Sequence, residues 1–113
     1  MPVSSTIAST TLPGLPLFHR GKVRDVYEVS DAQLLLVATD RLSAFDCILP
    51  TPIERKGQVL TAISAFWFGK LHEITPNHLI TASVDEMPEP LRSIPELRGR
   101  STLVKRTKVF PVE

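Results

Sequence analysis

Apolar residues recur with a helical spacing in the middle of the chain. Between residues 57 and 74 they stand three and four positions apart, at Val59, Ile63, Phe66, Trp67, Leu71 and Ile74. This is the period of an amphipathic α-helix with one apolar stripe. We therefore predict a helix over about 57–74 whose stripe, including its aromatic pair, faces a core. Thr75-Pro76-Asn77 is expected to end it.

Shorter apolar runs elsewhere predict strands. Residues 18–29 and 33–39 form a strand pair joined by the Ser30–Asp31 turn, and residues 34–38 are continuously apolar, as in a buried strand. Residues 78–82 and 101–113 are further strands. Pro50 and Pro52 keep their segment extended. The proline-rich stretch 85–99 reads as a surface excursion with a short helical turn near 89–94.

These elements predict an α+β fold, an antiparallel sheet with one main packed helix. Residues 1–14 are rich in Ser and Thr and carry no charged side chain, so we expect a flexible N-terminal arm. Residues 15–113 form a single lobe. Its last strand runs to the final residue without the polar tail that often ends a domain, so the lobe is expected to be incomplete.

Composition excludes several classes of protein. The chain is 42% hydrophobic with a net charge of +1, which argues against a disordered tail and against nucleic acid as a partner. No run approaches the roughly 20 apolar residues of a membrane span, and no signal peptide is evident. The single Cys47 allows no internal disulfide, suits a reducing cytosol and is expected to be buried. We expect a cytoplasmic protein without a membrane partner.

A basic turn lies in the segment HRGKVRDVYEV, residues 19–29. Gly21 allows the backbone to approach a ligand closely. Lys22 and Arg24 stand two residues apart, on one face of a strand. Backbone N–H groups beside two cations suit a phosphate chain. An ordinary hairpin with a solvated basic edge explains the same residues, and the sequence holds no GxxxxGK phosphate loop.

An acidic, hydroxyl-rich loop follows in the segment ATDRLSAFD, residues 38–46. The buried strand leads directly into Thr39, Asp40, Arg41, Ser43 and Asp46, and loops at strand ends are frequent binding sites. A capped turn with a local Asp40–Arg41 pair is the alternative for any single residue. Together the basic turn and this loop predict one wall of an active site.

Five blocks of the chain resemble the SAICAR synthetase family in order and approximate spacing. They are GKVRDVYEV, ATDRLSAFD, KGQVLTAISAFWF (56–68), NHLI (77–80) and GRSTLVKRTKVFPVE (99–113). Leu42 and Gln58 depart from the isoleucine and glutamate that are common there. Because the family continues well past such an FPVE segment, the resemblance implies an N-terminal ATP-binding lobe, similar to the upper lobe of protein kinases, without its C-terminal lobe.

The resemblance also implies a reaction. The complete enzyme joins L-aspartate to 5-amino-1-(5-phospho-ribosyl)imidazole-4-carboxylate, the carboxyaminoimidazole ribonucleotide, using ATP and Mg²⁺ in purine biosynthesis. An acyl phosphate precedes the products SAICAR, ADP and phosphate. This ATP-dependent carbon–nitrogen ligase is expected to be inactive as the 113-residue chain alone.

Site residues follow from the same resemblance. The expected ATP contacts are Gly21, Lys22, Val23, Arg24, Lys105, Val109 and Glu113. Asp46 is the catalytic candidate because it matches an acid near the imidazole substrate, and Asp40 and Ser43 are expected to assist it in substrate binding. Each acid could instead serve a turn or a salt bridge. The family's metal-binding acids largely lie beyond Glu113, so no metal ligand is assigned.

Two other classes of function are open to the sequence. One is a nucleotide-binding regulatory or scaffold module without catalysis, which predicts a polar, capped end after Val109 that the sequence lacks. The other is an interaction domain that exposes strand edges. The paired cations Lys22 and Arg24 argue against it.

Overall fold

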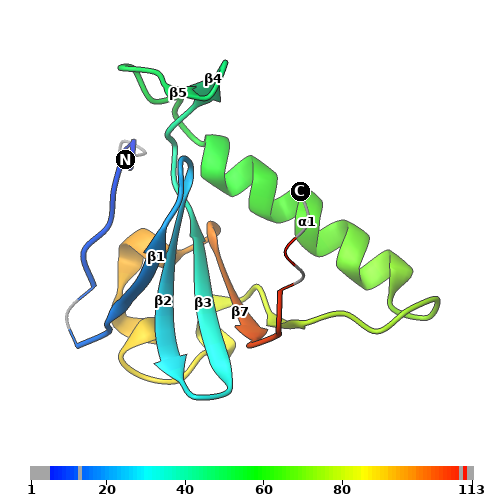
Figure 1. Cartoon of the computed structure of the whole chain (residues 1–113). Helices are drawn as coiled ribbons and strands as arrows, with labels where there is room; N and C mark the ends of the chain where they lie inside the picture. Colours follow the sequence, from blue (N-terminus) through cyan, green and yellow to red (C-terminus); the bar gives the residue numbers. More distant parts are fainter. Residues whose placement is uncertain (1–5, 13, 110, 112–113) are drawn as a thin grey trace.

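An antiparallel sheet of five strands forms the centre of the computed structural model, which describes residues 6–12, 14–109 and 111 (Figure 1). The strand order is β1-β2-β3-β7-β6. The strands are β1 (Leu17–Arg20), β2 (Arg24–Ser30), β3 (Gln33–Ala38), β7 (Ser101–Lys105) and β6 (Leu79–Thr81). One helix, α1 (Lys56–Leu71), and a two-stranded hairpin of β4 (Ser43–Ala44) and β5 (Cys47–Ile48) complete the regular structure beside three 3₁₀ turns. The predicted α+β class, with one helix on an antiparallel sheet, is confirmed.

One face of the sheet carries the hydrophobic core. The β2–β3–β7 register puts Tyr27, Leu35 and Leu103 on this face, because side chains alternate along a strand. The opposing layer comes from the 3₁₀ turns η1 (Val84–Glu86), η2 (Leu91–Ser93) and η3 (Pro95–Leu97), coloured yellow to orange in Figure 1. Its buried members are Val84, Met87, Leu91 and Leu97.

The surface excursion expected over 85–99 is therefore wrong. A short helical turn does lie within 89–94, as η2. The segment nevertheless covers the core, because its apolar residues all project from tight turns onto the same face of the sheet. Prolines prevented a regular helix there without preventing burial.

The N-terminal segment packs against the same layer. Leu12 belongs to the core, and Thr10 is buried against Asp25. The backbone of Ile7 exchanges hydrogen bonds with Asp40, whose N–H donates to the Ile7 carbonyl over 2.7 Å. The loose arm expected over 1–14 is therefore wrong for residues 7–12, while residues 1–5 and 13 lie outside the described residues.

Helix α1 lies on the other face of the sheet and contacts it through small residues. Gly57 and Thr61 are its buried positions, and a Cβ on Gly57 would stand 2.0 Å from the Ala38 carbonyl oxygen. The predicted core stripe is wrong, since its members are 42–78% exposed: Val59, Ile63, Phe66, Trp67, Leu71 and Ile74. The most apolar stripe is not the contact face, because close approach to a strand requires small side chains.

Two predicted strands also differ from expectation, since the one predicted over 18–29 is interrupted and the one predicted over 101–113 ends early. Residues 21–23 form a turn between β1 and β2, so Lys22 does not share a strand face with Arg24. The last strand ends at Lys105, and residues 106–109 are irregular. Among the residues that the structure describes, no helix has the length and hydrophobicity to cross a bilayer.

Candidate functional site

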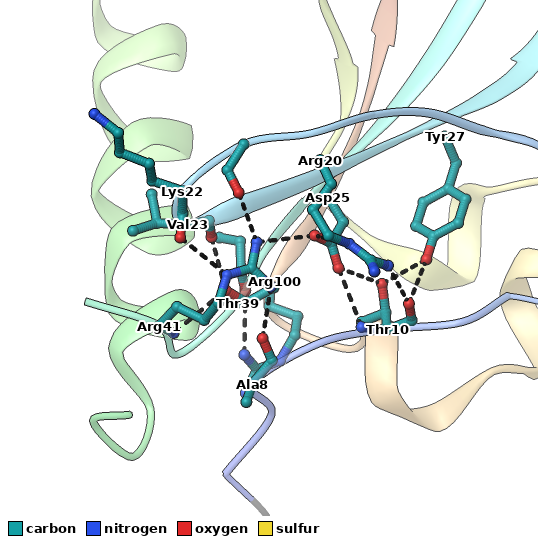
Figure 2. Close-up of polar contacts among 12 residues, drawn as sticks. Ala8, Thr10, Arg20, Lys22, Val23, Asp25, Tyr27, Thr39, Arg41 and Arg100 are labelled. Atoms are coloured by element: carbon teal, nitrogen blue, oxygen red, sulfur yellow. Dashed lines mark hydrogen bonds and ion pairs between the residues drawn. The ribbon is translucent and has the colours of Figure 1, made fainter. Parts of the chain in front are cut away.

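The basic turn is held by hydrogen bonds to all three of its carbonyl groups. Arg41 donates from Nε to the Lys22 oxygen over 2.9 Å and from Nη2 to the Gly21 oxygen over 3.0 Å. Thr39 donates from Oγ1 to the Val23 oxygen over 2.8 Å. Figure 2 shows these groups meeting at Arg41, with the Lys22 side chain pointing away. The turn therefore has a fixed shape, because its carbonyl oxygens all accept hydrogen bonds from Arg41 or Thr39.

A buried carboxylate, Asp25, anchors this arrangement (Figure 2). Its Oδ1 lies 2.9 Å from Nη2 of Arg41 and 3.0 Å from Nε of Arg20, and its Oδ2 accepts from the N–H and hydroxyl of Thr10. Burial by itself raises the pKa of Asp25, but the hydrogen bonds from Arg41 and Thr10 and the charge of Arg41 outweigh it, so the pKa lies below its ordinary value. Asp25 is thus an ionised structural group.

Asp40 is a second buried carboxylate, at the end of β3. Arg100 binds it with two nitrogens, at 2.9 Å and 3.2 Å, and the N–H groups of Gly57 and Ile7 complete its shell. Burial by itself raises the pKa of Asp40, but the hydrogen bonds from Arg100 and from the backbone outweigh this effect. The pKa therefore lies below its ordinary value, and Asp40 is also ionised. Asp40 was expected to assist in substrate binding. A direct contact with substrate is wrong, because both carboxylate oxygens already have protein partners and the side chain is inaccessible.

The acidic loop forms the β4–β5 hairpin. Phe45 and Asp46 occupy its tip with φ of 51° and 62°, a left-handed conformation uncommon outside glycine. Both side chains are almost fully exposed, while Ser43 is half-buried at the base. Cys47 is exposed, so its predicted burial is wrong: β5 has only the short β4 as a neighbour and does not join the sheet.

The basic turn and the acidic loop do meet. Lys22 Nζ lies 2.6 Å from Asp46 Oδ1, in an ion pair that is largely exposed to solvent. The two segments that were predicted to form one wall are thus adjacent, although the two residues that touch were assigned to different ligands. An ion pair in water contributes little to stability, so a ligand can separate it readily.

A pocket of about 230 Å³ lies between α1 and the sheet. Leu36, Thr102 and Val104 of the sheet and Leu60, Ser64 and Phe68 of the helix line it. Arg24 stands at the Ala38 end, and His78, packed edge-on against Phe68 with ring centroids 5.6 Å apart, stands at the Val104 end. The pocket therefore combines apolar walls with a cation, which suits a ligand with a flat apolar part and an anionic part.

The remaining predicted site residues lie around this pocket or beyond it. Lys105 is exposed at the end of β7, and its N–H donates to the His78 carbonyl over 2.8 Å. Val109 is exposed in the irregular segment. Glu113 lies outside the described residues. A Cβ at Gly21 would not clash with its neighbours, so the backbone conformation of the turn does not by itself require glycine at this position.

Sequence reasoning missed the supporting residues. Arg41 was read as part of a loop pair, and Asp25, Arg100 and Gly57 received no role. A signal for Asp25 was present, because it occupies an inward position of a strand beside Tyr27, where a charge requires a partner. Lys56 was missed as well. Its pKa is lowered by burial first and by the charges of Arg24 and Arg41, against the opposing effect of Asp40.

Comparison with known proteins identifies relatives of the chain. A family model described as SAICAR synthetase matches residues 17–113. The phosphoribosylaminoimidazole-succinocarboxamide synthase of Thermodesulfovibrio yellowstonii is 54% identical over 112 residues, which cover 98% of this chain and 38% of the relative. The enzyme of the same name from Thioalkalivibrio sulfidiphilus gives the same identity and the same coverage. The chain therefore spans little more than a third of these curated relatives.

Solved structures agree. The SAICAR synthase from Saccharomyces cerevisiae complexed with SAICAR superposes with a TM-score of 0.78 at 45% identity, over 90% of this chain and 37% of that chain. A type-2 SAICAR synthetase in complex with ADP, at 20% identity, shares the fold with a TM-score of 0.58, over 82% of this chain and 34% of that chain. The family match, the curated relatives and the shared fold together show that this chain belongs to the SAICAR synthetase family.

Proposed function

We propose that this chain supplies the ATP-binding part of a ligase that joins L-aspartate to the carboxyaminoimidazole ribonucleotide and forms SAICAR. The observation that carries the proposal is the family match over residues 17–113. The likeness to a yeast enzyme solved with SAICAR supports SAICAR as the product. The chain spans little more than a third of its curated relatives, so the complete reaction belongs to the longer protein.

Such a reaction proceeds in two displacements. A carboxylate oxygen of the imidazole substrate attacks the γ-phosphorus of ATP, and ADP leaves. The amine of aspartate then attacks the acyl carbon, and inorganic phosphate leaves with the proton going to solvent or a base. Positioning and charge neutralisation govern these steps more than covalent help from the protein.

The pocket between α1 and the sheet is where we place the nucleotide. Arg24 stands at one end for the phosphates, and Leu36 and Val104 offer apolar contact to the base. Lys105 donates its N–H to the His78 carbonyl and Arg106 donates its N–H to the Ala32 carbonyl, so we assign the adenine edge to the backbone that follows, at residues 107–109. The held shape of the Gly21–Val23 turn supports a rigid phosphate contact there.

The acidic hairpin is the part that we assign to the second substrate. Asp46 is exposed at its tip, where it would orient the substrate amine or carboxylate, and Ser43 stands at its base. Asp40 acts indirectly, by holding the start of α1 and Arg100 in place. Because Lys22 pairs with Asp46 in an exposed ion pair, separation of this pair would free Asp46 for its substrate.

Mg²⁺ accompanies ATP in the reaction that the resemblance implies. Within residues 6–12, 14–109 and 111, the structure contains no group of three His, Cys, Asp or Glu residues able to hold a metal ion. We therefore assign no residue of this part of the chain to Mg²⁺. A cytoplasmic location remains part of the proposal.

A chimera tests this function directly. This chain would replace the matching residues of the Thermodesulfovibrio yellowstonii relative, to which it is 54% identical. We expect the chimera to form SAICAR from ATP, aspartate and the imidazole carboxylate, while the 113-residue chain alone forms none. A folded chimera that binds the substrates without forming product would contradict the proposal and favour the scaffold alternative.

A further inference from the structure

We propose that Lys56 acts with Arg24 as a two-cation site for the phosphate chain of the nucleotide, at the start of α1. This inference rests on the proposed nucleotide-binding function and extends it to a residue outside the basic turn. It also changes the roles of the cations, since Arg24 is then paired with Lys56 rather than with Lys22.

Ala38 brings Arg24 and Lys56 together. In the β2–β3 ladder the Cα of Arg24 is directly opposite that of Ala38. On the helix side, the backbone of Gly57 packs so tightly on Ala38 that a Cβ there would lie 2.0 Å from its carbonyl oxygen. Lys56 precedes Gly57, so the two cations flank the same strand end, and Arg24 lines the pocket beside it.

The position of Lys56 is unfavourable without an anion. Its side chain is half-buried, and its pKa is lowered by that burial first and then by the charge of Arg24. It also occupies the first turn of α1, where the helix dipole disfavours a cation and no acidic residue compensates. The nearest opposing charge, Asp40, is already bound by Arg100, Gly57 and Ile7. Within the described part of the chain, neither Arg24 nor Lys56 has a carboxylate oxygen within 4.0 Å.

An anionic ligand relieves these unfavourable contacts at once. It would neutralise two adjacent charges and lie near the partial positive charge of the α1 N-terminus. The apolar pocket beside Arg24 accepts an uncharged part of the same molecule. Lys22, by contrast, already has Asp46 as a partner. The geometry therefore favours Lys56 over Lys22 as the second phosphate cation.

Calorimetric titration of the 113-residue chain tests this assignment. The ligands are ATP, adenosine and inorganic tripolyphosphate, and the variants are Lys56→Gln and the control Lys70→Gln, an exposed lysine in the last turn of the same helix. We expect Lys56→Gln to weaken binding of ATP and tripolyphosphate about tenfold, as for loss of a charge-assisted contact. Adenosine affinity should be unchanged, and Lys70→Gln should behave as wild type.

Stability separates this role from a structural one. Because Lys56 is unfavourably placed, Lys56→Gln should unfold at equal or higher urea concentration than wild type. Equal ATP affinity of Lys56→Gln and wild type would overturn the inference while leaving nucleotide binding intact. Failure of wild type to bind ATP would overturn the proposed function instead. If tripolyphosphate bound in a way that depends on Lys56 but ATP did not bind, the two-cation site would stand and the nucleotide would be rejected as its ligand.

Discussion

Two buried carboxylates determine how the candidate site is held. Asp25 connects the N-terminal segment to Arg41 and thereby to the carbonyls of the basic turn. Asp40 connects the same N-terminal segment to Arg100 and to the start of α1. Each carboxylate has a guanidinium and backbone or hydroxyl donors as partners, so each is ionised despite burial. At the scale of single residues, the site depends on charges that no ligand reaches.

Removing the charge of Asp40 should be costly. Asp40→Asn leaves the Arg100 guanidinium, 2% exposed, without a counter-charge, and we expect a loss of about 3 kcal/mol or more in unfolding free energy. Asp85→Asn is the matched control, because Asp85 pairs with Arg98 on the surface and should change stability by less than about 1 kcal/mol. Urea denaturation measures both. Similar losses for the two variants would show that the buried pair is not a structural support.

Acid should destabilise the protein through the same two groups. The pKa values of Asp25 and Asp40 lie below the ordinary 3.8 when the chain is folded, so the folded state binds fewer protons than the unfolded state. The stability that these two ionised carboxylates contribute is complete above the ordinary pKa of 3.8, and it declines as the pH falls below that value. Denaturation in urea between pH 6 and pH 2.5, pH values chosen to be about two units above and one below the ordinary pKa, should show this decline. A stability that stays flat or rises toward the acid end would contradict the assignment.

At the scale of elements, the orientation of α1 was the main error of sequence reasoning. The three- and four-residue spacing predicted a helix close to the observed Lys56–Leu71. It did not predict the contact face, because Gly57, Thr61 and Ser64 are too small or too polar to contribute to an apolar pattern. The 3₁₀ turns were missed as core elements for a related reason, since short irregular turns have no period to detect.

Two glycines of α1 provide a matched test of this packing. Gly57→Ala should destabilise the protein by about 2 kcal/mol or more, because the new Cβ collides with the Ala38 carbonyl. Gly69→Ala meets nothing within 4 Å and should stabilise the protein by about 0.5–1 kcal/mol, as alanine favours helix. Thermal and urea unfolding measure both changes. If Gly57→Ala were as harmless as Gly69→Ala, α1 would not approach β3 as described.

For the whole molecule, the sheet separates the hydrophobic core from the candidate site. The face with Tyr27, Leu35 and Leu103 is sealed by the 3₁₀ turns and the N-terminal segment. The opposite face carries α1 and the pocket, with the basic turn at its end. The sequence predicted the class of fold, the basic turn and the family. It could not predict which face stays accessible, because that depends on long-range contacts such as Asp40 with Arg100 and Gly57 with Ala38.

The central claim is that nucleotide binds on the α1 side of the sheet. Titration of the ¹⁵N-labelled chain with ATP, followed by amide chemical shifts, tests it most directly. We expect saturable shifts at Val23, Arg24, Leu36, Lys56 and Val104, with Val84, Met87 and Leu91 on the sealed face unaffected. Saturable shifts confined to the sealed face, or none at any ATP concentration, would contradict the account.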